Sequence, residues 1–339
     1  MPALLLLLAA AQVPAAQAPP PAAPLVVAHR GASGVLPEHT LPAVAYAHAA
    51  GADYVEQDVV LTRDGVPVVL HDIYLDATTD AAAVFPDRAV PDAPPGERYP
   101  VFNFTLEEVK RLRASERVDP ATGRAAFPRR FPPRTGDFEV PTLAEELELI
   151  RGMNRSSLRR VGVFPELKDP AAHAAAGLDL AAATLRVLAE FGYEDRGDRC
   201  YVQCFDFDES KRVRGELGCD LKLVRLTAPG EVLSDADLAA TAAVCDGLGP
   251  PLSAALAFES YRFRSRGLIE RAAAAGLAAF PWTARRDALP GAAADPAGFA
   301  DLHRAVFDAG AAGIFTDFPG ASADLARAWT GDRAGRRGR

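Results

Sequence analysis

The sequence is poor in cysteine, with four in 339 residues, and the spacing of these four matches no zinc-binding pattern. On a strand that rises ~3.3 Å per residue, Cys200 and Cys204 would lie about 13 Å apart, which is too far for a bridge. We therefore expect small buried thiols, without a disulfide, at Cys200, Cys204, Cys219 and Cys245.

Concentrated positive charge is also missing. Lys and Arg number 37 against 45 Asp and Glu, for a net charge of −8, and no basic stripe runs through the body of the chain. Because nucleic-acid binding needs cations clustered along a track of phosphates, we expect no nucleic-acid partner. The one basic cluster lies at the C-terminal end, where we expect a disordered tail over residues 331–339.

Long hydrophobic runs are absent as well. The apolar run at 4–10 is too short to cross a bilayer, and the small residues at 16 and 18 form a cleavage pattern typical of a secretory signal. We expect a signal peptide over 1–18, a Pro-rich lead-in over 19–24, and a periplasmic or secreted protein without stable membrane insertion. No cysteine stands at the cleavage site, so we expect no lipid anchor there.

What the sequence does contain is an alternation of short apolar runs and alanine-rich helical stretches, which is typical of β/α folds. The runs lie at 25–28, 54–58, 66–70, 162–166, 200–204, 221–225, 244–247, 277–282 and 313–316. The dipeptide Asp64-Gly65 indicates a two-residue turn, so the third run would fold back antiparallel on the second. Eight parallel strands remain, and they predict an α/β fold, a (β/α)8 TIM barrel over residues 25–330.

One connection is much longer than the others. Residues 75–140 contain many Pro, Arg and aromatic residues. Because a barrel loop of this length is usually functional, it predicts a small insertion after the second barrel strand and its hairpin, covering the rim. The alternative is a disordered excursion, against which the aromatic content counts.

Polar and aromatic side chains stand at the C-terminal ends of the predicted strands, where barrel enzymes carry their catalytic groups. In chain order they are His29, Arg30, Glu56, Asp58, Glu166, Lys168, Gln203, Trp282 and Asp317. With Asp64 and Gly65 as the two loop residues, cross-strand partners in the predicted hairpin have residue numbers that sum to 129. This pairing would place His71 opposite Asp58 at a distance of roughly 5 Å. A second histidine would thus reach the rim.

These residue types suit phosphodiester chemistry. The carboxylates Glu56, Asp58 and Glu166, without cysteine ligands, favour a hard divalent cation such as calcium or magnesium over zinc. The cations of Arg30 and Lys168 would complement a phosphate next to the metal. In-line displacement at phosphorus needs one group that removes a proton and one that supplies a proton, which a pair of histidines, His29 and His71, can provide.

The remaining histidines are weaker candidates. His39 and His48 fall on the first predicted helix, and His173 and His303 on outer helices, where solvated or packing roles are expected. His39 is the exception to watch, since Glu38 and His39 would open the helix on the rim side. Ser33 lacks the G-x-S-x-G spacing of a nucleophile elbow, so we do not expect serine catalysis.

Several segments, in order over about 25–320, resemble the glycerophosphodiester phosphodiesterases, and most closely their bacterial periplasmic, calcium-dependent branch. The segments are Ala28-His29-Arg30-Gly31, Pro37-Glu38-His39-Thr40, Glu56-Gln57-Asp58-Val59, Val69-Leu70-His71-Asp72, Pro165-Glu166-Leu167-Lys168, Gln203-Cys204-Phe205 and Phe315-Thr316-Asp317-Phe318-Pro319. The resemblance implies hydrolysis of deacylated phospholipids to sn-glycerol 3-phosphate and an alcohol, through attack of the glycerol 2-hydroxyl and a cyclic phosphate that water opens.

The resemblance also implies roles for individual residues. It implies His29 and His71 as the acid–base pair, and a metal at Glu56, Asp58 and Glu166. It places Arg30 and Lys168 on the phosphate, and Gln203 and Trp282 against the substrate. Calcium is favoured mainly by the resemblance, since the ligand chemistry accepts magnesium or another divalent cation as well.

Two alternatives stay open. A phospholipase D-like hydrolase acting on lysophospholipids would share the histidines and the acidic cluster, but would need an apolar lip for docking to a membrane. A non-catalytic surface-binding barrel would be expected to lack at least one of these residues, and all of them are present. The sequence leaves the preferred alcohol and the oligomeric state open.

Overall fold

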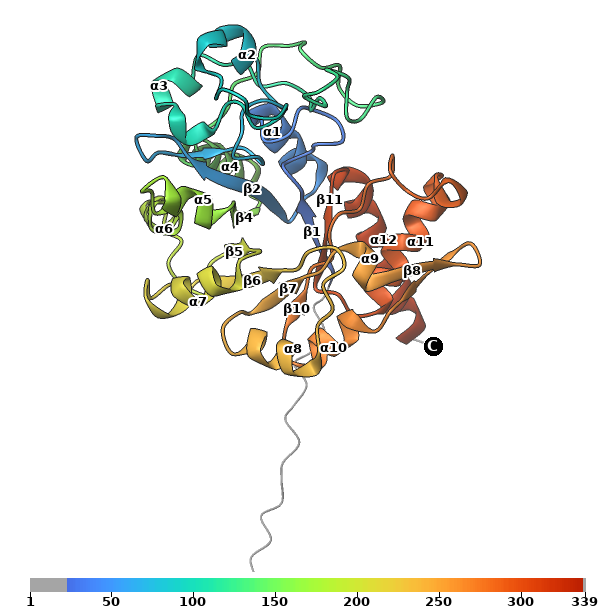
Figure 1. Ribbon diagram of the computed structural model, residues 1–339. Helices are drawn as coiled ribbons and strands as arrows, with labels where there is room; N and C mark the ends of the chain where they lie inside the picture. The colour runs from blue at the N-terminus through green and yellow to red at the C-terminus, as the bar shows by residue number, and fades with distance from the viewer. Residues whose placement is uncertain (1–22, 338–339) are drawn as a thin grey trace, which may run out of the picture.

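The computed structural model describes residues 23–337, and these form a nearly closed barrel of eight parallel strands ringed by helices (Figure 1). Around the barrel the strands follow the order β10 (Ala278–Ala279), β7 (Gly247–Gly249), β6 (Lys222–Leu226), β5 (Tyr201–Cys204), β4 (Gly162–Leu167), β2 (Tyr54–Leu61), β1 (Leu25–Ala28) and β11 (Gly313–Thr316). Backbone hydrogen bonds from Ala312 to Ala279 and from Phe315 to Pro281 join the two end strands. The predicted (β/α)8 fold is confirmed.

The predicted strand positions hold except at the seventh strand. Val244 and Cys245 both donate their backbone N–H groups to the carbonyl of Thr241, in the turn that ends α8 (Asp235–Ala242). Their donors are therefore not available to a sheet, and the strand begins only at Gly247. The predicted signal peptide over 1–18 lies outside the described residues, as does most of the lead-in.

The outer ring consists of helices that follow the barrel strands along the chain. They are α1 (Leu41–Ala50), α4 (Leu143–Ser157), α5 (Pro170–Ala175), α6 (Leu180–Glu190), α7 (Phe207–Gly215), α8, α9 (Leu252–Ala255), α10 (Leu268–Ala274), α11 (Pro296–Asp308) and α12 (Pro319–Arg337). The alanine-rich stretch over residues 171–191 is split between α5 and α6, and Gly177 between them takes a φ of 78°. Helix α12 continues to Arg337, so the expected tail is helical as far as the structure describes it.

The hairpin after β2 has a different register from the predicted one. Val59 pairs with Val69 and Leu61 with Pro67 in the short strand β3 (Pro67–Val69), so the two-residue turn is wrong. The loop has three residues, closed by the Thr62 N–H on the Val66 carbonyl, with Gly65 in the left-handed region at φ 76°. Leu70, and not His71, therefore lies opposite Asp58 and donates its N–H to the Asp58 carbonyl.

Residues 70–142 form a small lobe beside the rim of the barrel, at the top of Figure 1. The lobe contains α2 (Ala81–Val84), α3 (Leu106–Val109), the short 3-10 helices Pro86–Arg88 and Val101–Asn103, and loops. Its apolar side chains, with Phe104 fully buried, gather into a cluster of their own against the β2–β3 hairpin. Burial of these aromatic residues gives the loops a packed core.

Aromatic rings fill the interior of the barrel. Phe164 on β4 stacks on Tyr201 at 4.8 Å between ring centroids, and its edge meets Phe280 and Phe315 at 5.3 and 5.1 Å. We expect Phe164→Ala to lower the free energy of unfolding by about 3–5 kcal/mol, because the rings around it cannot collapse into the space. Urea unfolding measures this, with Val232→Ala, at a side chain 88% exposed, as the control near zero. A loss below about 1 kcal/mol would contradict this account of the core.

Candidate active site

The ends of the barrel strands converge on one small cavity of about 100 Å3. Of the residues predicted from the sequence, it is lined by His29, Arg30, Glu56, His71, Glu166, Lys168, Gln203 and Trp282. The remaining one, Asp58, is buried directly beside this set, 3.3 Å from Arg30 and 3.6 Å from Lys168. The structure thus brings the predicted site residues together, although the hairpin register that was used to place His71 is wrong.

Three buried carboxylates crowd together at this rim. Glu56 and Asp58 lie two residues apart on β2, and Asp58 is the register partner of Glu166 on β4. Burial, Asp58 and Glu166 raise the pKa of Glu56 well above its usual value. Burial also raises the pKa of Glu166 to about 7, with Lys168 opposing and Asp58 adding to the rise. Glu56 and Glu166 therefore hold their charge poorly unless further positive charge is supplied.

A metal ion fits this cluster. His39, Glu56 and Asp58 each offer one ligand atom within 4.8 Å of the others. The Oδ1 atom of Asp58 is buried and has no hydrogen-bond partner. A bound cation would satisfy this oxygen. Glu166, the predicted third ligand, instead accepts a hydrogen bond of 2.6 Å from Lys168. The structure therefore joins His39 to Glu56 and Asp58, with Glu166 alongside Asp58.

Each of the two rim histidines is backed by an aspartate. Nδ1 of His29 lies 2.7 Å from Asp317, and Nδ1 of His71 lies 2.5 Å from Asp72. An ionised carboxylate only accepts, so Nδ1 carries the hydrogen in both rings and Nε2 keeps its lone pair. Burial and the Arg30 charge lower the pKa of His29 to about 3 and that of His71 to about 4. Both rings are therefore neutral near pH 7.

Two cations stand among the carboxylates. Arg30 has a left-handed backbone at φ 56°, which directs its N–H to Glu56 at 2.6 Å, while its guanidinium reaches Glu38 and Asp58 at 3.0 and 3.3 Å. Lys168 contacts Glu166 and Asp58 from the end of β4. Positive charge is thus held at the rim in a position to meet an anionic substrate.

The other two predicted residues form a wall of the cavity. Trp282 donates its indole N–H to the Gly249 carbonyl at 2.9 Å, and its ring meets the edge of Phe205. Gln203 donates to the Phe164 carbonyl at 3.4 Å, and its Oε1 is buried without a partner. The side of the cavity next to β5 and β10 is therefore mainly apolar, with one free amide oxygen.

Sequence reasoning gave too little weight to four residues. His39 does not lie on a helix, because α1 begins at Leu41 with Thr40 as its cap, and its Nε2 lies 2.8 Å from Asp58. The other three are partners of predicted site residues: Glu38 accepts a hydrogen bond from Arg30, Asp72 from His71, and Asp317 from His29. All four fall inside the quoted segments, but only their spatial partners identify their roles. The packing roles expected for the other histidines are confirmed at His48, His173 and His303, which hydrogen-bond within the scaffold.

A wider recess of about 540 Å3 lies beside this cavity. His71 and Lys168 line both spaces, and the recess adds Asp72, Tyr74, Glu97, Arg117 and Asp169. Burial and the nearby charges of Glu97 and Asp169 raise the pKa of the Tyr74 hydroxyl. This space, with Glu97 and Asp169 in its lining, is the acidic recess.

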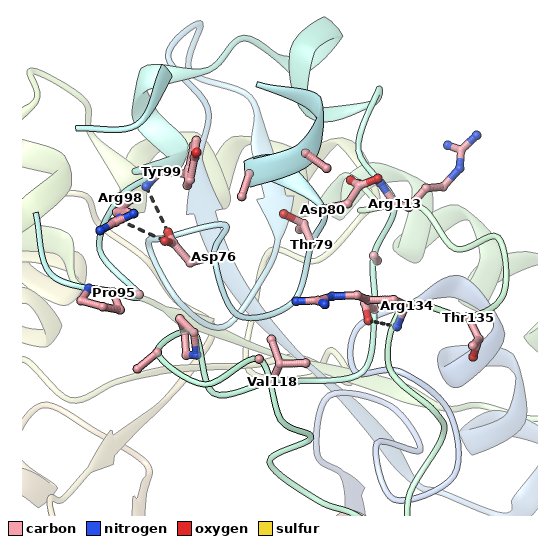
Figure 2. Close-up of a pocket in the computed structure, with 18 of the residues that line it drawn as sticks. Asp76, Thr79, Asp80, Pro95, Arg98, Tyr99, Arg113, Val118, Arg134 and Thr135 are labelled. Carbon is pink, nitrogen blue, oxygen red and sulfur yellow. Dashed lines mark hydrogen bonds between the residues drawn. The ribbon is translucent and has the colours of Figure 1, made fainter. Parts of the chain in front are cut away.

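A further cavity of about 670 Å3 lies inside the lobe (Figure 2). Asp76 accepts hydrogen bonds there from the backbone N–H groups of Arg98 and Tyr99, and Ser115 accepts one from Arg134. None of the predicted site residues lines it, and we assign the chemistry to the rim.

Comparison with known proteins identifies the family. The model of the glycerophosphoryl diester phosphodiesterase family matches residues 29–321. The chain belongs to this family. A glycerophosphodiester phosphodiesterase of Haemophilus influenzae is 37% identical over 329 residues, 87% of either chain, and one of Treponema pallidum is 41% identical over 57% of this chain and 54% of its own. The sequence-based family assignment and the prediction of an enzyme are confirmed.

Solved structures of the family share the barrel. One from Silicibacter pomeroyi is 27% identical, covers 91% of this chain and 95% of its own, and has a TM-score of 0.67. A phosphodiesterase of Oleispira antarctica, in complex with the product sn-glycerol-3-phosphate, is 22% identical, with coverage of 89% and 96% and a TM-score of 0.60. The second likeness supports the fold alone.

Proposed function

We propose that the protein hydrolyses glycerophosphodiesters to sn-glycerol 3-phosphate and an alcohol, using a divalent cation and a pair of histidines. One observation carries the proposal: His29 and His71, each with Nδ1 on an aspartate, line one cavity together with Arg30, Lys168 and the acidic cluster. The similar proteins of Haemophilus influenzae and Treponema pallidum are named glycerophosphodiester phosphodiesterases, which supports this substrate class. We propose a periplasmic or secreted location for this activity, which the predicted signal peptide over residues 1–18 supports.

The chemistry follows from the positions of the proton-carrying groups. In the first step Nε2 of one histidine takes the proton of the glycerol 2-hydroxyl, while the oxygen of this hydroxyl forms a bond to phosphorus. The other histidine gives a proton to the departing alcohol oxygen as the P–O bond to the alcohol breaks. The phosphate anion next to this second ring raises its pKa, because opposite charge favours the protonated form. Water then opens the cyclic phosphate with the two roles reversed.

The charges of the site favour a divalent cation. Glu56, Asp58 and Glu166 carry three negative charges when ionised, against two positive charges on Arg30 and Lys168. A divalent cation and a singly charged phosphodiester together add one positive charge and balance the site. When bound, the cation would stabilise negative charge on the phosphoryl oxygens and acidify the attacking hydroxyl. Glu56, Asp58 and His39, together with Glu166, would hold it, and calcium suits these mainly oxygen ligands.

Metal affinity should depend steeply on pH. The cation competes with protons on Glu166, whose pKa is about 7, and on Glu56, whose pKa is well above normal. We expect the Kd for calcium to rise by about tenfold or more between pH 8 and pH 6, because these carboxylates must lose protons before they bind the metal. Calorimetric titration at both pH values measures this, and a Kd that is equal at the two would contradict it.

The acidic recess predicts a preference among alcohols. Glu97 and Asp169 face it without an ion-pair partner among the described residues, so a cationic alcohol is favoured there. We expect kcat/KM for glycerophosphocholine to exceed that for glycerophosphoglycerol by about threefold to tenfold, and Glu97→Gln to reduce the difference. Asp208→Asn, at an exposed acid on α7, is the matched control. Equal kcat/KM values for the two diesters would remove this preference.

The test of the function is an assay of the purified protein on glycerophosphocholine, with sn-glycerol 3-phosphate release coupled to its dehydrogenase. We expect activity that EDTA abolishes and calcium restores. Cleavage of a lysophospholipid in place of every glycerophosphodiester would favour the phospholipase D-like alternative. Inactivity on both, with calcium present, would leave the surface-binding alternative.

A further inference from the structure

Two arginines of the lobe contact carboxylates at the rim of the barrel. Arg117 donates from Nη1 to Asp72 at 2.6 Å, and from Nη2 and Nε to the two oxygens of Glu38 at 2.7 and 3.2 Å. Asp72 holds His71, and Glu38 holds Arg30. The Arg117 guanidinium thus links Asp72, the partner of His71, to Glu38, the partner of Arg30.

Arg130 makes the equivalent contact on the other side. It donates from Nη2 to Asp317 at 2.6 Å, and Asp317 holds His29. Its Nε and Nη2 also grip Asp287 at 2.8 and 3.1 Å, and the Phe127 ring covers its face at 3.7 Å. The Arg130 side chain is only 4% exposed, so this is a built contact and not a passing surface pair.

We propose that Arg117 and Arg130 are positioning residues, each of which holds the aspartate behind one of the two histidines, so that the lobe completes the acid–base pair. The inference rests on the proposed function. His29 follows barrel strand β1 and His71 lies at the start of the lobe, and a lobe arginine holds the aspartate behind each: Arg117 contacts Asp72 behind His71, and Arg130 contacts Asp317 behind His29.

The physical role of the arginines is to keep each aspartate ionised and aimed at its histidine. Burial opposes ionisation of Asp72, but the hydrogen bond from His71 and the charge of Arg117 lower its pKa to about 2. An ionised aspartate fixes the ring with its hydrogen on Nδ1 and leaves Nε2 free toward the cavity. Without the arginine, the carboxylate can turn away, and the ring can exchange its tautomer or rotate.

The two aspartates differ in the number of arginines that contact them. Asp317 also accepts a hydrogen bond of 2.8 Å from Arg285, whereas the Asp72 carboxylate has Arg117 as its only arginine partner among residues 23–337. Loss of Arg130 therefore leaves a second cation behind His29. Loss of Arg117 leaves none behind His71, so its effect should be the larger.

The test compares Arg117→Ala and Arg130→Ala with Arg113→Ala, a lobe arginine that pairs with Asp137 at the surface. Once wild-type activity is established, we expect kcat to fall roughly 10–100-fold for Arg117→Ala and by a smaller factor for Arg130→Ala, with KM changed by less than about threefold. Arg113→Ala should keep wild-type kcat. Added guanidinium should restore part of the lost kcat, which it would not do for a merely misfolded variant.

A second readout does not depend on turnover. In 15N spectra of histidine-labelled protein, His71 should carry its hydrogen on Nδ1 in the wild type and lose this preference in Arg117→Ala, while Arg113→Ala keeps it. Wild-type kcat in both variants, or an unchanged His71 tautomer in a folded Arg117→Ala, would overturn the inference. If the wild type cleaves no glycerophosphodiester, the proposed function fails, and the tautomer comparison alone decides the positioning role.

Discussion

Replacing His71 or His29 by alanine should reduce kcat for glycerophosphocholine by roughly a thousandfold, with little change in KM. General acid–base catalysis by one positioned side chain contributes about 10²–10⁴-fold. Each ring presents Nε2 to the cavity because Nδ1 is held by Asp72 or Asp317. Substrate affinity should persist, since Arg30 and Lys168 remain.

The control for this experiment is His48→Gln. His48 is also buried, but it contacts Asn154 on the outer helices and has no part in the rim. Glutamine can keep that hydrogen bond, so kcat should stay within about twofold. The double variant lacking both rim histidines should be only slightly slower than either single variant, because residues that act as a unit are not additive. A His71→Ala variant that keeps a tenth of wild-type kcat would remove His71 from the acid–base pair.

The sequence was sufficient to predict the barrel and most of its rim. Residues such as His29, Glu56 and Glu166 follow runs of buried apolar side chains, and the ends of parallel strands meet at one edge. Their convergence therefore depends only on strand order and direction. Local pattern and one general rule of barrel construction place these residues without any knowledge of side-chain contacts.

The hairpin register could not be obtained in this way. Asp64-Gly65 is compatible with two- and three-residue loops, and the choice rests on contacts of the Asp64 carboxylate. It accepts from the Thr62 hydroxyl at 2.7 Å and from the N–H of Leu106, which lies 42 residues away in the chain. Local sequence patterns cannot predict a turn whose length depends on a hydrogen bond to so distant a residue.

The groups that orient the site escaped prediction for the same reason. Asp317 stands at the end of a predicted strand, but its partner His29 is 288 residues away in the chain, and Arg130 contacts it across 187 residues. His39 was assigned to a helix, whereas a φ of 61° keeps it outside α1 and turns it toward Asp58. Ligand and orienting roles of this kind depend on tertiary contacts, which composition and periodicity do not encode.

Asp58→Asn should abolish both metal response and activity. Asp58 lies at the centre of the acidic cluster: its Oδ2 contacts His39 at 2.8 Å, Arg30 and Lys168 lie within 3.6 Å, and its Oδ1 is buried without a hydrogen-bond partner. The amide is isosteric but brings no charge, and one of its two positions becomes an N–H2 donor that repels a cation. We expect the Kd for calcium to rise about 100-fold and kcat at low calcium to fall about a thousandfold.

Thermal unfolding with and without calcium separates metal binding from catalysis. A ligand that binds only the folded state stabilises it by about 2.7 kcal/mol at 100 times its Kd, so calcium should raise the Tm of the wild type. The same calcium concentration should leave the Tm of Asp58→Asn almost unchanged, while Asp208→Asn, at an exposed acid, keeps the wild-type shift. A full calcium shift in Asp58→Asn would mean that the cation is held without Asp58. The proposed site would then have to move to Glu56 and Glu166, where Lys168 already occupies one carboxylate oxygen.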